Sequence, residues 1–108
     1  MYRKFTASRV SEKNVLFPPT IIFTDEGVTV KMPALLHHNT EFMPYEAISS
    51  VFIHTPLAGF STITFYAYGR EILVHGFFQR EVREMKELVE GMTTQLPKPS
   101  LRNFRKER

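Results

Sequence analysis

Histidine has the widest chemistry of the residues in this chain, because an imidazole can bind a metal ion or transfer a proton near neutral pH. The four histidines are His37, His38, His54 and His75. His37 and His38 are adjacent, so on a strand they would point to opposite faces and could not easily share one ion. His54 and His75 fall in different strand-like segments and could meet, but no Asp or Glu accompanies them at ligand spacing. We therefore predict no metal site and no cofactor.

The carboxylates and serines do not form a catalytic pattern either. Acid–base catalysis needs carboxylates that converge on a pocket, whereas residues 81–90 place theirs along the solvent side of one expected helix. Ser49, Ser50 and Ser61 lack the strained glycine turn of a hydrolase nucleophile. The chain has no cysteine and no glycine-rich phosphate-binding loop. We predict that the protein is not an enzyme.

Aromatic residues near the end of the chain are the candidates for recognition. Strand alternation places Tyr66 and Tyr68 on one face and Phe65 on the other, so one of the two sets is exposed. An exposed aromatic stripe beside Arg70 would stack on nucleic-acid bases or on a partner peptide. The alternative is that the tyrosines pack against the terminal helix or the N-terminal residues. Tyr66, Tyr68 and Arg70 are the predicted partner-binding residues.

The net charge of +3 is unevenly distributed. Residues 1–13 hold four basic residues and one acidic residue. Residues 14–97 hold five basic and nine acidic residues, and residues 98–108 hold five basic residues and one acidic residue. Basic tails can bind the phosphates of nucleic acid or of anionic lipid, or simply be solvated. The candidate phosphate contacts in the C-terminal tail are Lys98, Arg102, Arg105, Lys106 and Arg108.

Length and composition indicate one globular domain. The chain has 108 residues, of which 43% are hydrophobic and ten are phenylalanine. No apolar run approaches the roughly 20 residues that span a bilayer, and no signal peptide follows the N-terminus, so a cytoplasmic protein is expected. The expected organisation is a polar arm at 1–13, a folded domain at 14–97 and a basic tail at 98–108, with residues 1–13 forming a loose arm or a weak first strand.

The elements that would position these residues are mostly short strands. Residues 20–24 and 28–32 have the composition and period of strands, and the turn between them ends at Gly27, which can adopt positive φ. Further along we expect a second turn at 39–40, a corner at 44–46, strands at 48–55, 62–68 and 71–75, a break at 56–59 and a two-residue link at 69–70.

The last element changes period. Apolar residues recur three and four apart, which predicts an amphipathic helix. Gly91 weakens its last turns and Pro97 with Pro99 ends it. The stripe consists of Val82, Met85, Leu88, Val89, Met92 and Leu96.

The amino-acid sequence of three segments and of the terminal helix resembles that of the bacterial pleckstrin-homology-like (PH-like) domains. The segments are 23–28, 43–51 and 59–65, and the resemblance covers roughly residues 20–92. It implies a mostly β, α+β fold: an antiparallel β-barrel or sandwich of six or seven strands, with two near-orthogonal sheets and one C-terminal α-helix plugging an open end. In eukaryotic members the first hairpin loop often carries basic residues that hold inositol phosphates, but Asp25 and Glu26 make this loop acidic and repulsive to phosphate.

Three functions are consistent with these observations. The first is a non-catalytic interaction module that binds a protein partner, or a second copy of itself, through a sheet edge or the groove between an edge strand and the helix. The second is electrostatic binding of nucleic acid or anionic membrane through the two basic ends. The third is a carrier of an apolar ligand in the barrel, although ten phenylalanines would fill the interior.

Overall fold

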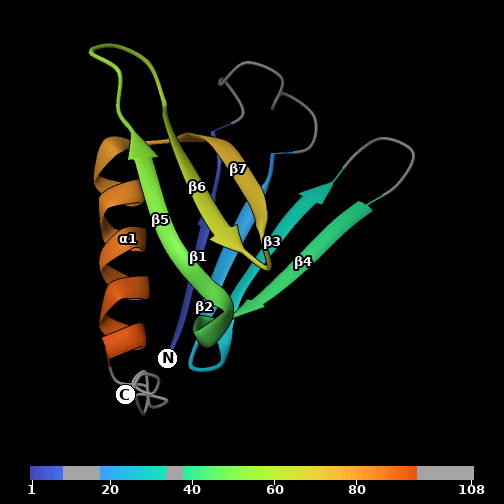
Figure 1. The fold of residues 1–108 in the computed structure, drawn as a ribbon. Helices are drawn as coiled ribbons and strands as arrows, with labels where there is room; N and C mark the ends of the chain where they lie inside the picture. The colour runs from blue at the N-terminus through green and yellow to red at the C-terminus, as the bar shows by residue number, and fades with distance from the viewer. Residues whose placement is uncertain (9–17, 34–37, 95–108) are drawn as a thin grey trace.

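The computed structural model describes residues 1–8, 18–33 and 38–94. Seven strands form two antiparallel sheets, one of four strands in the order β1-β2-β3-β4 and one of three in the order β5-β6-β7, and a helix follows them (Figure 1). The elements are β1 (Tyr2–Thr6), β2 (Thr20–Thr24), β3 (Gly27–Pro33), β4 (His38–Pro44), the 3-10 turn η1 (Tyr45–Ala47), β5 (Ile48–His54), β6 (Ser61–Ala67), β7 (Arg70–Phe77) and α1 (Gln79–Thr94). The prediction of a mostly β fold with one C-terminal helix is confirmed.

The hairpin of β2 and β3 forms where the sequence predicts it, with Ile21 opposite Val30 and Phe23 opposite Val28. Gly27, however, does not have the positive φ that we expected of it. It is needed for close approach instead, because a Cβ at this position would lie 2.4 Å from the main-chain oxygen of Met43 on β4. The prediction had the right residue and the wrong reason.

Strand β4 corrects the prediction of a turn at Asn39-Thr40. Both residues belong to β4, in which Asn39 pairs with Met32 and Thr40 with Lys31. Pairing along β3 outweighs the weak local turn preference of these two residues. The predicted corner is confirmed, since Pro44 ends the strand and η1 follows it.

The turn between β6 and β7 lies one residue earlier than predicted. Tyr68 and Gly69 both have positive φ, of 56° and 70°, and Ala67 pairs with Arg70 across them. Two consecutive residues of positive φ make a turn whose twist matches that of the flanking strands. Tyr68 therefore leaves the strand face that it was expected to share with Tyr66.

The N-terminal residues contribute a strand to the domain. Tyr2–Thr6 pairs with β2 along its whole length, so the strand, not the loose arm, is the correct alternative for these residues, and the folded body includes them. Beyond β1, the Ser8 N–H donates to the Gly76 carbonyl of β7 at 2.8 Å, which joins the two sheets. Residues 9–13 of the predicted arm lie outside the described residues.

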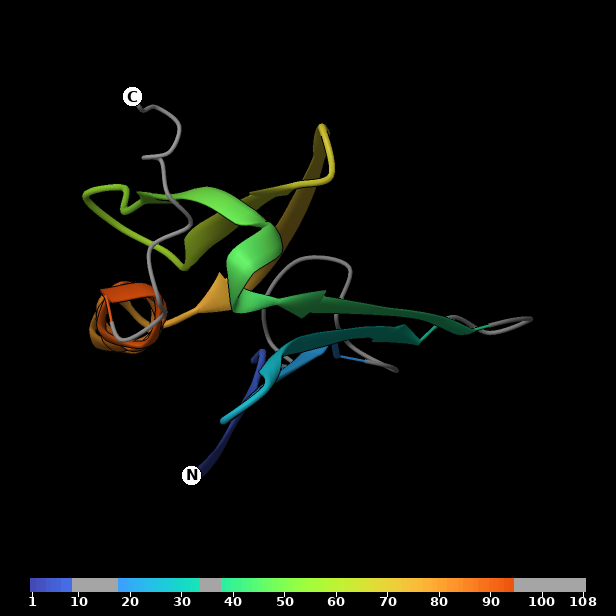
Figure 2. The same cartoon turned by 60° about the horizontal axis from the view of Figure 1, so that its bottom comes forward.

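The core lies between the two sheets and α1. Phe23 is fully buried at its centre, packing edge-on against Phe5 of its own sheet at 5.7 Å and facing Phe65 of the other sheet at 6.5 Å between ring centroids. Figure 2 shows α1 end-on at the side where the sheets part. Its predicted stripe is confirmed for the described residues: Val82, Met85 and Val89 are buried and Leu88 and Met92 pack against the core.

The helix begins after a partial cap. The Glu81 carboxylate accepts a hydrogen bond from the Phe78 N–H at 2.9 Å, which satisfies one of the free donors at the N-terminus. The helix continues through Gly91 to Thr94, so the expected weakness at Gly91 does not end it. Leu96, Pro97 and Pro99 lie outside the described residues.

Candidate functional site

The structure separates the three residues predicted to bind a partner. Tyr66 lies on the outer face of the three-stranded sheet, where its ring packs edge-on against Phe52 at 5.4 Å. Its hydroxyl donates to Glu71 at 2.8 Å, and this hydrogen bond raises the pKa of Tyr66. Tyr68 is 63% exposed in the β6–β7 turn. No continuous aromatic stripe results.

Arg70 is engaged within the molecule. Its guanidinium donates to both oxygens of Glu41 on β4, at 2.5 and 3.0 Å, and this contact raises the pKa of Arg70. The ion pair links the edge strand β7 of one sheet to the edge strand β4 of the other. Arg70 therefore bridges the two sheets at their surface, a role that local sequence patterns do not show because the two residues are 29 positions apart.

The histidines do not assemble a metal site among the described residues. His54 lies on β5 and His75 on β7, with β6 between them, so their backbones are about 10 Å apart. The Nδ1 atom of His75 is 2.8 Å from the Thr62 hydroxyl on β6. No three His, Cys, Asp or Glu side chains come together in residues 1–8, 18–33 and 38–94. His37 and the five candidate phosphate contacts of the C-terminal tail lie outside those ranges.

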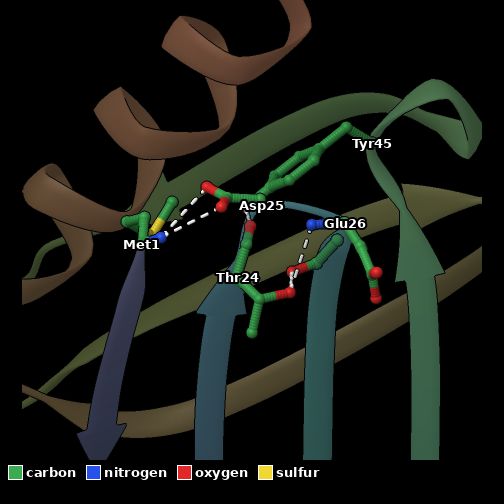
Figure 3. A network of polar contacts seen from close by, with 6 residues as sticks. Met1, Thr24, Asp25, Glu26 and Tyr45 are labelled. Atoms are coloured by element: carbon green, nitrogen blue, oxygen red, sulfur yellow. Dashed lines mark hydrogen bonds and ion pairs between the residues drawn. The ribbon is translucent and has the colours of Figure 1, made fainter.

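The β2–β3 turn presents carboxylates, as the sequence shows, and a polar network holds it (Figure 3). Both oxygens of Asp25 accept from the amino group of Met1 at 3.1 Å. The Glu26 N–H donates to the Thr24 hydroxyl at 3.2 Å, and the Tyr45 hydroxyl donates to the Thr24 carbonyl at 2.6 Å. Tyr45 thus connects η1 to the end of the first hairpin.

Tyr45→Phe should destabilise the fold by about 1 kcal/mol, because it leaves the Thr24 carbonyl without its partner. Burial, and then the charge of Asp25, raise the pKa of Tyr45 above its ordinary value of 10.0. The fold favours the neutral hydroxyl. Its contribution to the free energy of unfolding is therefore complete below pH 10 and is lost as the pH rises through the raised pKa. Urea unfolding should therefore show a constant difference in the free energy of unfolding between the wild type and Tyr45→Phe from about pH 7 to 9, and this difference should narrow above about pH 10. A difference that widens at alkaline pH would contradict this assignment.

A groove of about 400 Å³ runs between the edge strand β5 and α1. Its floor is apolar, made of Ile48, Val51 and Val89, each less than a tenth exposed. Its rim is polar and carries an ion pair between Lys86 and Glu90 at 3.9 Å. The remaining residues of the rim are Ser49, Ser50 and Thr93.

The β5 strand has an unpaired edge along this groove. In the described part of the chain β5 pairs only with β6, and α1 packs against β5 without pairing with its edge. The register shifts at Ser49, whose hydroxyl donates to the Tyr66 carbonyl at 3.0 Å. Such a bulge bends the strand, here at the start of the groove. An extended chain placed here can pair with the free backbone groups of β5 and insert side chains over the floor.

The sequence predicts an edge-and-helix groove in general terms but does not identify the residues that line it. The available signal is modest: two serines interrupt the apolar pattern between Ile48 and Val51. On the helix, Lys86 is three residues before Val89 and Thr93 is four residues after it, so both flank it on the helix surface, and Glu90 is four residues from Lys86. Only the packing of α1 against β5 brings the two sets together.

No protein-family model matches this chain, and no similar sequence was found among curated proteins. Across the described residues, the one α-helix is too short and too polar to cross a membrane.

Proposed function

We propose that this protein is a non-catalytic interaction module that binds an extended segment of a partner protein, or of a second copy of itself, by strand addition to β5. The observation that supports this proposal is that an unpaired strand edge borders a groove with an apolar floor and a polar rim. The main-chain groups of β5 would supply affinity and the floor would supply selectivity.

The alternation of side chains defines the preferred ligand. Residues of an added strand point alternately to the two sides of the sheet. Those on the inner side would lie over Ile48, Val51 and Val89, which favours aliphatic side chains. Those on the outer side would lie next to Phe52, which is 59% exposed, and cross-strand contact with an aromatic or β-branched residue is favourable there. The ligand is therefore an extended segment that alternates aliphatic residues with aromatic or β-branched ones.

The PH-like assignment is part of this proposal. It is supported by the element order, in which four strands of one sheet and three of a second are followed by one C-terminal helix. It is also supported by the position of α1 beside the opening between the sheets. Electrostatic binding through the tails stays a prediction, because the C-terminal tail and residues 9–13 of the N-terminal arm lie outside the described residues.

A displayed library of random ten-residue peptides would test the proposal. The selected peptides should alternate in the way described, and Thr93→Arg should weaken their binding by about tenfold, since the new side chain fills the rim of the groove. Thr94→Arg is the matched control, because both threonine hydroxyls donate to helix carbonyls but only Thr93 lines the groove. Equal binding to both variants, or no enrichment at all, would refute the groove as the site.

Two proline variants distinguish strand addition from simple occupation of the groove. Successive N–H groups of a strand point to opposite sides, so only one of Ser50→Pro and Val51→Pro removes a donor that pairs with β6. The variant that stays folded has lost the outward-facing donor, and it should lose peptide binding. If it binds as well as the wild type, the peptide does not add to the sheet. Sedimentation equilibrium of the same variants shows whether a second copy is the partner.

A further inference from the structure

The outer face of the four-stranded sheet differs in chemistry from the rest of the surface. Residues on this face alternate with the buried ones, so Lys4 of β1 and Lys31 of β3 point outward while Phe5 and Val30 point to the core. Aromatic residues stand on its two edge strands, Tyr2 on β1 and Phe42 on β4. Among the described side chains, the rest of the face includes five threonines, Ile22 and Pro44.

This face carries positive charge without any carboxylate, although the described residues contain more acidic than basic side chains. Glu41 points to the other side of its sheet and pairs with Arg70, and Asp25 with Glu26 stays in the turn at one end. Neither Lys4 nor Lys31 forms an ion pair with a described residue. Both ammonium groups are therefore available to an anion, and no acidic neighbour on the face repels it.

The tip of the Phe42 ring occupies space that a side chain at Gly27 would fill. A Cβ at Gly27 would lie 2.8 Å from the ring atom Cζ of Phe42, so the ring covers the backbone of β3 there. Its other side is open, since Phe42 is 48% exposed, and Tyr2 is 63% exposed. The edge strands β1 and β4 that carry them are three strand spacings apart, about 14 Å, and the two residues are offset by two positions along the strands. They are two separate stacking surfaces, and each has a lysine near it: Lys4 is two residues from Tyr2 on β1, and Lys31 lies on β3, the strand that pairs with the one carrying Phe42.

We infer that the outer face of the four-stranded sheet binds single-stranded nucleic acid. Lys4 and Lys31 would contact phosphates, and bases would stack on Phe42 and Tyr2, as on other sheet-based binders of single strands. A duplex hides the flat faces of its bases inside the stack, so it cannot use these rings. This site is separate from the β5–α1 groove, and its chemistry comes from different elements.

To test this inference, the affinity of the full chain for a fluorescent oligothymidylate of twelve nucleotides is measured as a function of salt concentration. For single strands the slope of log K against log salt is about −0.7 per neutralised phosphate. The double variant Lys4→Gln/Lys31→Gln should therefore reduce the slope by about 1.4. The matched control Arg80→Gln/Arg83→Gln removes the same charge from α1 and should leave the slope unchanged.

Stacking is tested separately from charge. Phe42→Ala should weaken binding by about tenfold without changing the salt slope. Tyr2→Ala, at the edge strand, should act in the same direction and keeps the test valid if the first variant unfolds. Three results would overturn the inference. The first is that the oligonucleotide does not bind at about 20 mM salt, and the second is that its binding depends only on the basic residues of 98–108. The third is that binding to anionic lipid vesicles requires Lys4 and Lys31 whereas binding to the oligonucleotide does not.

Discussion

Phe23→Ala should cost about 3–5 kcal/mol of unfolding free energy, the range for removing a buried phenylalanine. The Phe23 ring contacts Phe5 within its own sheet and Phe65 across the core, so its loss weakens the packing inside one sheet and between the two. A domain of this size is stable by about 5–15 kcal/mol. The variant should therefore retain only part of the wild-type stability, and urea unfolding should show a much lower midpoint.

Ile22→Ala is the control for this prediction. Ile22 is adjacent on β2 but points to the outer face and is half-buried, so its truncation should cost about 1 kcal/mol. Equal losses for the two variants would mean that Phe23 does not join the two sheets.

Local patterns in the sequence were sufficient for the elements whose period is strong. The β2–β3 hairpin alternates regularly and α1 repeats its apolar residues three and four apart, and both form as predicted. The errors concern residues whose conformation is decided by distant partners. Thr40 was predicted in a turn but pairs with Lys31, and β1 was ambiguous because its pairing with β2 involves residues some 20 positions away.

The candidate sites show the same limit more clearly. Tyr66, Tyr68 and Arg70 are close in the sequence, which made them a plausible set, but one turn residue and one long-range ion pair place them in three different environments. The groove needs the packing of α1 on β5, and the outer face of the four-stranded sheet needs the register of four strands. Neither the packing nor the register can be read from spacing along the chain.

Gly27→Ala should destabilise the protein by about 3 kcal/mol, at the upper end of the usual cost of overpacking. The added Cβ would lie within 3.0 Å of the Met43 oxygen and of the Pro44 Cα, and these are backbone atoms that cannot rotate away. Strands β3 and β4 must therefore move apart at the corner from which η1 leads to β5. The loss of unfolding free energy is measured by urea unfolding, with the same dependence on urea concentration assumed for the variant and the wild type.

Gly91→Ala is the matched control, and we expect the opposite sign for it. Apart from the helix's own backbone, no described atom lies within 4 Å of a Cβ at Gly91, and alanine is favoured over glycine inside a helix by about 1 kcal/mol. If Gly27→Ala stabilised the protein as Gly91→Ala should, β3 and β4 would not approach as closely as described. Phe42 would then have no fixed position over Gly27, and the stacking surface proposed on the outer face of the four-stranded sheet would lose its support. The stability of this one variant therefore tests the geometry of the fold and the basis of the nucleic-acid inference together.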